Sequence, residues 1–456
     1  MNYPNFLLVL YGDNVYEFFD LPTTQTEDTI YTFEQRQTYK AYSYFKLENA
    51  RITLLQHNNS DIQEAINAKM ILNTGAFFVR RSIDFSYSFN SDIGEFFLDK
   101  RVSIQKLAYW RDLGHQDIIF GDDPHFDTRS FNELQISQDR LSLVKRSTEK
   151  KIKDEIAYLM NLPDQFAFLF PRIRRTSHSN EWEYEMEYIP ARPLSEYLCF
   201  WKLHPASWTQ VFEQLMGLVC QFRDHRDKDA INITLNSEKR KALYLKMFNS
   251  RKSQFPKELS RVTKCSSISI NGKEIKGLPT VIDRFEQDLI QMSNSLEVSF
   301  YHGDLGLSNI LFHPPSGLIK LIDPKGSLFE EGKCLGDYRY DVAKLFHSVV
   351  YGYDFVNYQL YSVGQLDSTN QFNLKFIGYQ DHKWVSSAFI GAVNSRFSSE
   401  TLRSIKILTA MLFLNMIPLH SDSSEKQLAY LLIAILILNE IYNDEGIFDI
   451  VLNSET

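Results

Sequence analysis

Residues 301–326 read YHGDLGLSNILFHPPSGLIKLIDPKG, and this stretch decides the fold. Two short apolar runs flank the turn residues Pro-Pro-Ser-Gly, which is the pattern of a β-hairpin. Asp304 and Asn309 precede the first run, and Asp323 follows the second. Because a short hairpin returns its two ends to the same place, we expect Asn309 and Asp323 to face one small volume, with Asp304 just outside it.

The residue types at these three positions suit phosphoryl transfer. An amide oxygen and a carboxylate that lie close together are hard ligands suited to Mg²⁺, which makes Asn309 and Asp323 the predicted metal ligands. A separate carboxylate nearby can accept a proton from an attacking hydroxyl, and Asp304 is the predicted catalytic base. The alternative is an ordinary hairpin with polar residues on its surface.

The spacing of Asp304 and Asn309 matches the kinase catalytic loop, in which a metal-binding Asn follows the base Asp. His-Gly before Asp304 and Asp-Pro-Lys-Gly at residue 323 depart from the protein-kinase pattern. His-Gly-Asp with Asn five positions on, then Ile-Asp, resembles the aminoglycoside phosphotransferase and choline kinase group of small-molecule kinases. Gly-Asp-Tyr-Arg-Tyr-Asp-Val-Ala, residues 336–343, looks like the element that follows in that group. The resemblance implies an α+β, bilobal kinase-like fold with ATP and Mg²⁺ as cofactors, and an architectural role for Asp341.

Length and composition limit the alternatives. A chain of 456 residues is too long for one compact core, so two or three domains are expected. The net charge of −8 argues against nucleic acid as a partner. The four cysteines are scattered, as in a cytoplasmic protein with reduced thiols. We expect no signal peptide and no membrane insertion, because the apolar run 428–438 is too short to span a bilayer and indicates a buried helix.

The first 125 residues carry a different set of motifs. The run Phe6–Leu10 predicts a buried, parallel-type strand that ends in Gly-Asp-Asn, and two strands are expected around the turn 48–50. Asn-Thr-Gly at 73–75 precedes another predicted strand, and Trp-Arg-Asp-Leu-Gly follows at 110–114. Together these resemble the later part of a sugar nucleotidyltransferase. The glycine-rich, arginine-containing loop that opens that family is missing before residue 10, so we expect a degenerate α/β domain at 1–125.

The kinase small lobe is predicted at 126–190 and the large lobe at 191–456. An alternating strand ends at Lys145, and a helix that follows contains Glu155. A strand Lys paired with a helix Glu holds the ATP phosphates in kinase folds. The alternative is a surface Lys and a surface Glu, since other charged residues lie nearby. The backbone of Glu187 to Ile189, before Pro190, is the predicted hinge that binds an adenine edge.

The whole pattern predicts a small-molecule kinase. Its combination of motifs looks like phosphotransferases of bacterial capsule and surface polysaccharide synthesis, which implies transfer of the ATP γ-phosphoryl group to a hydroxyl of a sugar, a polyol or a similar polar molecule. Arg339 is a candidate for contact with this acceptor. Tyr351, Tyr353, Asp354 and Tyr358 are candidates for lining its pocket, and the alternative is that these aromatic residues belong to the core. Two other functions remain open: a nucleotide-binding pseudokinase or scaffold, and a sugar-nucleotide-binding module in the same pathway. The identity of the acceptor and the oligomeric state are not predicted.

Overall fold

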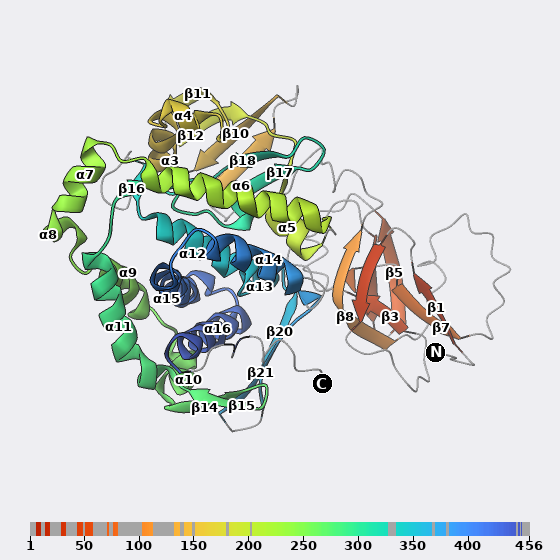
Figure 1. Ribbon diagram of the computed structural model, residues 1–456. Helices are drawn as coiled ribbons and strands as arrows, with labels where there is room; N and C mark the ends of the chain where they lie inside the picture. The colour runs from red at the N-terminus through yellow and green to blue at the C-terminus, as the bar shows by residue number, and fades with distance from the viewer. Residues whose placement is uncertain are drawn as a thin grey trace. The chain divides into compact units, whose positions relative to one another are not determined.

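The structure is a computed structural model, and its residues divide into two compact units, Met1–His125 and Phe126–Thr456 (Figure 1). Before residue 132 only strands are described. From there the described residues are 132–136, 141–147, 151–178, 182–200, 203–326, 334–366, 370–379, 383–443, 446 and 448.

The first unit is described by two sheets. Its strands are β1 (Phe6–Leu10), β2 (Asn14–Phe18), β3 (Thr29–Thr32), β4 (Ser43–Glu48), β5 (Arg51–His57), β6 (Ile71–Leu72), β7 (Ala76–Arg80) and β8 (Ser103–Asp112). The strand order is β1-β7-β3-β8-β2 in one sheet and β5-β4-β6 in the other. The β4–β5 hairpin and the strand β7 confirm two of the expectations from sequence.

The expectation of a parallel-type strand at β1 is wrong. β1 lies at the sheet edge and pairs antiparallel with β7, with Phe6 opposite Arg80. A continuous apolar run does not by itself distinguish the two kinds of pairing, since it reports burial and not strand direction. Asp13, in the Gly-Asp-Asn motif that follows β1, lies outside the described residues.

The second unit begins with an antiparallel sheet covered by a helix. Its strands, in the order β11-β12-β10-β9, are β9 (Asn132–Ile136), β10 (Ser142–Ser147), β11 (Ile173–His178) and β12 (Trp182–Glu187). Helix α3 (Lys151–Met160) packs Ile152 and Ile156 against Leu143 and Tyr184, because these apolar residues recur at helical spacing on one face. A short helix, α4 (Asp164–Ala167), follows.

The predicted hairpin is confirmed. β17 (Ile310–His313) pairs antiparallel with β18 (Leu318–Leu321), and β13 (Arg192–Pro193) adds a third strand beside β17. Leu321 donates its N–H to the carbonyl of Leu169 at 2.7 Å, so the hairpin is attached to the segment that follows α4. The hairpin therefore lies where the β9–β12 sheet meets the helical part of the unit.

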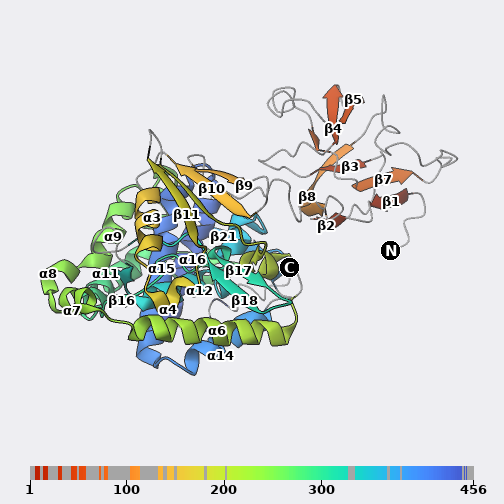
Figure 2. The same ribbon diagram turned by 90° about the horizontal axis from the view of Figure 1, so that it is seen from above.

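Helices form most of the rest of the unit, as Figures 1 and 2 show. They are α5 (Leu194–Cys199), α6 (Pro205–Asp224), α7 (Lys228–Leu235), α8 (Ser237–Arg240), α9 (Leu243–Lys252), α10 (Ser260–Lys264), α11 (Leu278–Asn294), α12 (Tyr338–Val349), α13 (Tyr353–Asn357), α14 (Lys383–Asn394), α15 (Ser399–Met416) and α16 (Ser424–Tyr442). Short 3₁₀ turns lie at Lys257–Leu259, Leu307–Asn309 and Ile417–His420.

The core of the helical part is built around α15, which packs against both α12 and α16. The buried face of α16 includes Leu431 to Leu438, which confirms the buried helix expected at 428–438. Within the described residues, one segment, Ser399–His420, is long and apolar enough to cross a membrane by length and composition, and 61% of its most apolar window is buried inside the protein.

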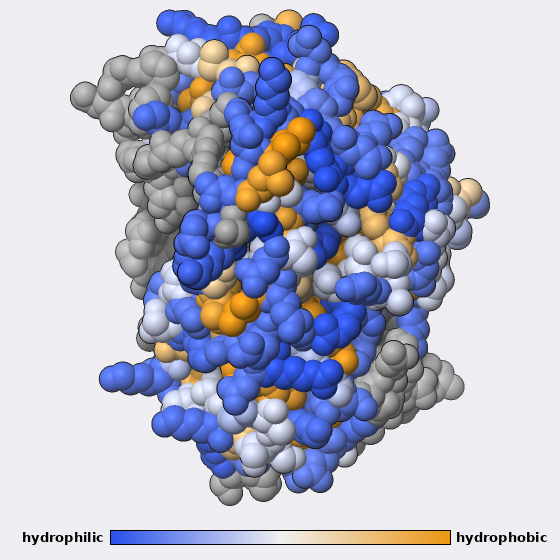
Figure 3. Space-filling view, turned by 60° about the vertical axis from the view of Figure 1, so that its left-hand side comes forward, coloured by the Kyte–Doolittle hydropathy of each residue, from blue (hydrophilic) through white to orange (hydrophobic). Residues whose placement is uncertain are grey.

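Four more strands form a separate small sheet in the order β15-β14-β21-β20. They are β14 (Ser267–Ile270), β15 (Lys273–Lys276), β20 (Tyr361–Leu366) and β21 (Gln371–Phe376). Asn271 and Gly272 join the first two with positive φ angles of 48° and 80°, as a tight hairpin turn requires. The face of the molecule in Figure 3 is mostly hydrophilic, with hydrophobic residues in small separate groups.

Candidate active site

The loop between β16 (Ser299–Phe300) and the hairpin is hydrogen-bonded to helix α12. Asp341, in the first turn of α12, accepts the backbone N–H groups of His302 and Gly303, both at 2.7 Å. Gly303 has a φ of 83°, and a Cβ on it would lie 2.7 Å from the carbonyl oxygen of Lys325. Only glycine fits this conformation and this close approach to Lys325. The backbone conformation directly before Asp304 is therefore fixed.

His302 braces the loop from inside. Its Nε2 lies 3.1 Å from the carbonyl oxygen of Ile322, and its Nδ1 accepts the N–H of Asp304 at 3.2 Å. These two contacts fit a neutral ring that carries its proton on Nε2. Burial lowers the pKa of His302 to about 4, so the ring stays neutral at physiological pH. His302 therefore connects the loop before Asp304 to the end of β18.

Asn309 and Asp323 lie beside each other at the open ends of the hairpin. Ile322, directly before Asp323, donates its N–H to the carbonyl of Asn309 at 3.0 Å. The side-chain amide of Asn309 donates to the carbonyl of Asp304 at 2.8 Å, which turns its Oδ1 away from the loop. Asp323 has a φ of 52°, an uncommon conformation for a residue other than glycine, and its side chain is 50% exposed.

These two residues suit a hard cation. They present an amide oxygen and a carboxylate, the donor chemistry of Mg²⁺, which keeps waters and phosphate oxygens as its other ligands. Among the described residues there is no group of three or more His, Cys, Asp or Glu side chains that could hold a metal by themselves. The donor set therefore fits an ion that arrives with a nucleotide better than a metal held by protein ligands alone.

Lys145, on β10, contacts two carboxylates at once. Its Nζ lies 2.8 and 2.9 Å from the two oxygens of Glu155 on α3 and 2.6 Å from Oδ1 of Asp323. Burial lowers the pKa of Lys145, but the two carboxylates raise it more, so the ammonium stays charged. Burial raises the pKa of Glu155 to about 7, while Lys145 and the hydroxyl of Tyr184, 2.5 Å from Oε1, oppose the rise.

Asp304 has an ion pair that was not expected from the sequence. Its Oδ1 lies 2.7 Å from Nζ of Lys344, on α12, and the side chains are 39% and 15% exposed, respectively. Partial burial raises the pKa of Asp304, but Lys344 more than offsets this, so the pKa lies below its usual value. The sequence held one clue to this ion pair. Lys344 follows Asp341 by three residues and so lies on the same face of the helix, toward the catalytic loop.

The predicted hinge is only partly available to a ligand. Glu187 donates its backbone N–H to the carbonyl of Arg172 at 2.9 Å, and Tyr188 donates to the carbonyl of Leu141 at 3.1 Å. The carbonyl of Ile189 accepts the N–H of Ala191 at 2.8 Å. The N–H of Glu187 is therefore engaged within the protein, and Ile189 is the residue of this segment whose N–H has no backbone partner among the described residues.

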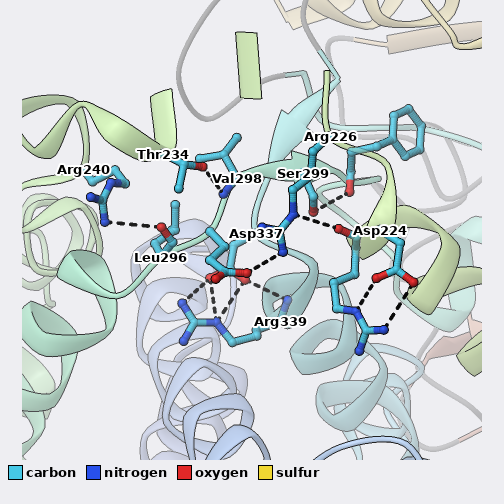
Figure 4. Close-up of polar contacts among 12 residues, drawn as sticks. Asp224, Arg226, Thr234, Arg240, Leu296, Val298, Ser299, Asp337 and Arg339 are labelled. Atoms are coloured by element: carbon cyan, nitrogen blue, oxygen red, sulfur yellow. Dashed lines mark hydrogen bonds and ion pairs between the residues drawn. The ribbon is translucent and has the colours of Figure 1, made fainter. Parts of the chain in front are cut away.

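Arg339, a candidate for contact with the acceptor, is used inside the protein. Its guanidinium forms an ion pair with Asp337 at 2.8 Å and also reaches the carbonyl of Met292 at 3.3 Å; Figure 4 shows the two side chains facing each other. Asp337 in addition accepts the hydroxyl of Tyr244 at 2.5 Å. Both partners in the ion pair are largely buried, which indicates a structural role for Arg339.

A group of buried polar atoms without hydrogen-bond partners lies around Tyr353. Within the described residues these atoms include Nε2 of His347 and the hydroxyl of Tyr430. The rings of His347 and Tyr430 stack on that of Tyr353, with centroids 4.0 and 5.9 Å away. Burial raises the pKa of the neighbouring Asp354 to about 7, while a hydrogen bond with the Ser348 hydroxyl and the charge of Lys344 limit the rise. Unpaired buried polar groups are few in native proteins, so such a group indicates water or a ligand.

No protein-family model and no curated protein matches the chain. Solved structures similar to it include the GDP complex of wild-type aminoglycoside 2'-phosphotransferase-IIIa, with 9% identity and a TM-score of 0.44 over 72% of this chain and 98% of that one. An aminoglycoside phosphotransferase from Streptomyces rimosus ATCC10970 is 14% identical, with a TM-score of 0.35 over 64% and 97%. A choline kinase from Cryptosporidium parvum Iowa II is 14% identical, with a TM-score of 0.33 over 74% and 98%.

Proposed function

We propose that this protein is an ATP-dependent small-molecule kinase that transfers the γ-phosphoryl group to a hydroxyl of a sugar, a polyol or a similar polar acceptor. One observation carries the proposal: Lys145 joins Glu155 and Asp323 in one cluster, and Asn309 connects that cluster to Asp304. A buried Lys–Glu pair, two oxygen ligands and a separate exposed carboxylate are the parts that phosphoryl transfer requires.

Each residue has a distinct part in this reaction. Asp304 orients the acceptor hydroxyl and takes its proton as the oxygen attacks the γ-phosphorus, and ADP leaves on the opposite side. Lys145 holds the α- and β-phosphates, and Glu155 keeps the ammonium in place while it does so. Asn309 and Asp323 hold Mg²⁺, which when bound neutralises charge on the phosphates. The protein contributes positioning and charge, and no covalent intermediate is needed.

The acceptor side favours a molecule with several hydroxyl groups. Nε2 of His347 and the hydroxyl of Tyr430 are buried polar atoms without a partner among the described residues, and sugar or polyol hydroxyls can both donate and accept hydrogen bonds. The resemblance of the sequence to capsule phosphotransferases supports, as part of this proposal, a role in bacterial surface polysaccharide synthesis. In this pathway the first unit, with its nucleotidyltransferase-like motifs, is a candidate binding module for sugar nucleotides.

The test is ATP consumption with Mg²⁺ against a panel of sugars, polyols, amino alcohols and aminoglycosides. We expect turnover with a polyhydroxyl acceptor and a loss of roughly 10²- to 10⁴-fold in kcat for Asp304→Asn, since a general base contributes about that much. The KM for Mg·ATP should change little, because Asp304 does not hold the nucleotide. Asp283→Asn, at an exposed position on α11, is the control and should behave like the wild type.

Two results count against the proposal. Nearly full activity in Asp304→Asn would remove the assigned base. Tight binding of Mg·ATP with no turnover by the wild type on any acceptor would favour a nucleotide-binding scaffold.

Titration of the full chain with sugar nucleotides, followed by calorimetry, tests the binding role proposed for the first unit.

A further inference from the structure

Helix α12 presents one polar stripe to the catalytic loop. Asp341, Lys344 and Ser348 occupy positions i, i+3 and i+7, which lie on one face of a helix. All three side chains contact the loop: Asp341 accepts two backbone N–H groups, Lys344 pairs with Asp304, and Ser348 Oγ accepts the N–H of Leu307 at 3.4 Å. Asp341 and Ser348 hold the backbone of the loop, whereas Lys344 holds the side chain assigned as the base.

The site has two lysines with little exposure, and each pairs with a carboxylate that is more exposed than the lysine. Lys145 pairs with Asp323 at 2.6 Å, and Lys344 pairs with Asp304 at 2.7 Å. They differ in what else they touch. Lys145 also has Glu155, so it keeps a partner when Asp323 turns to a metal ion. Within the described part of the chain, Asp304 is the only carboxylate within ion-pair distance of Lys344. Leaving Asp304 would strand a mostly buried ammonium, which is strongly unfavourable.

We propose that Lys344 is a positioning residue of the phosphoryl-transfer site. It holds Oδ1 of Asp304, which leaves Oδ2, an atom with no hydrogen-bond partner among the described residues, to receive the proton of the acceptor hydroxyl. This inference rests on the proposed kinase function and goes beyond it, because it assigns a lysine on a helix some forty positions along the chain to the geometry of the base.

The position of the base matters for rate more than for nucleotide binding. A displacement of about 1 Å in a reacting group costs roughly 100-fold in rate. Without the ammonium, the Asp304 side chain is free to rotate, and its oxygens no longer have a fixed orientation toward the acceptor. Asn309 and Asp323 do not touch Lys344, so the nucleotide side of the site should stay intact.

Two variants and a matched control separate this role from a structural one. Lys344→Met removes the charge at similar length, and Lys344→Arg keeps it. Lys406→Met removes another largely buried lysine, which pairs with Glu440 at 2.5 Å in the same helical core. For each protein the measurements are kcat and KM with the acceptor from the panel that gives the highest wild-type turnover, Mg·ATP affinity by calorimetry, and the thermal unfolding midpoint.

We expect Lys344→Met to lower kcat about 100-fold while Mg·ATP affinity stays within about twofold of wild type. The kcat of Lys344→Arg should be at least tenfold higher than that of Lys344→Met. Lys406→Met should lower the unfolding midpoint and leave kcat unchanged.

Three results would overturn the inference: a kcat for Lys344→Met within twofold of wild type, equal losses in kcat and Mg·ATP affinity, or a loss in Lys406→Met as large as in Lys344→Met. In each of these cases the wild type still turns over, so the proposed kinase function survives. If the wild type shows no turnover, the proposed function and this inference fail together.

Discussion

Asp304 and Asp323 are equally conspicuous in the sequence, but the structure gives them different surroundings. Asp323 has a left-handed backbone and shares a lysine with Glu155, whereas Asp304 lies on a loop braced from behind by α12. A carboxylate that shares its lysine can exchange it for a metal ion at small cost. Asp304 is the one carboxylate among the described residues within ion-pair distance of Lys344, so it keeps its place, as a base must.

The first prediction concerns Asp323. Asp323→Ala should weaken Mg·ATP binding at least tenfold, because a carboxylate ligand to the ion is lost, and it should affect ATP binding without Mg²⁺ much less. Lys145 retains Glu155, so the β10–α3 pair should persist. Calorimetric titration with and without Mg²⁺ measures both quantities, with Asp283→Ala as the exposed control. Unchanged Mg·ATP affinity in Asp323→Ala would exclude it as a ligand.

A second prediction at this scale follows from His302. Its pKa lies near 6.5 in the unfolded chain and at about 4 in the folded protein, because burial disfavours the charged ring. The stability that neutral His302 contributes is therefore fully present above pH 6.5 and is lost as the pH falls toward 4. At a pH where His302 is protonated in both the folded and the unfolded protein, the lowered pKa corresponds to a loss of roughly 3 kcal/mol in the free energy of unfolding.

Denaturant unfolding between pH 7.5 and 4.5 tests this. The stability difference between wild type and His302→Asn should shrink as the pH falls, since the wild type alone loses the contribution of the neutral ring. His313→Asn, at an exposed position in the hairpin, should follow the wild type. A wild-type-to-His302→Asn difference that is constant across this range would show that His302 does not have a lowered pKa.

At the scale of elements, the hairpin was predictable and the helix stripe was not. Apolar runs around Pro-Pro-Ser-Gly give a local pattern, and β17 and β18 form where it places them. The contacts of α12 with the catalytic loop join residues about forty positions apart, and no local pattern encodes such a distance. Polar residues at 341, 344 and 348 on an otherwise buried helix were the available clue, because buried polar groups need partners.

Gly303 supplies a prediction for the catalytic loop. Gly303 already has a φ of 83°, which a residue with a Cβ adopts only with strain. Gly303→Ala would also place that Cβ 2.7 Å from the carbonyl oxygen of Lys325. Gly272→Ala is the matched control, since its φ is 80° and nothing lies within 4 Å of the added Cβ. We expect Gly272→Ala to cost about 1 kcal/mol and Gly303→Ala roughly 2 kcal/mol more, with loss of turnover. If urea unfolding shows that the two variants are destabilised equally, the catalytic loop must shift to make room for the Cβ of Gly303→Ala.

At the scale of the whole molecule, the sequence predicted the mixed helix and sheet class, and it predicted where several strands of the first unit lie. It was wrong about the pairing of β1, because an apolar run reports burial and leaves strand direction open. The hinge was also less available than expected. Backbone N–H groups at Glu187 and Tyr188 are paired with segments that are near them only in the folded sheet. Long-range pairing thus accounts for what was missed in the fold and in the site.

The last prediction separates the two units. Asp304, Asn309, Asp323, Lys145 and Lys344 all lie in Phe126–Thr456, which is compact by its own internal contacts. Residues 126–456 expressed alone should therefore bind Mg·ATP and turn over the acceptor with a kcat within a few-fold of the full chain. The same fragment with Asp323→Ala is the control for specific binding. A fragment that unfolds cooperatively and binds Mg·ATP, yet shows no turnover, would mean that the first unit takes part in acceptor binding or catalysis, and its role as a separate module would have to be abandoned.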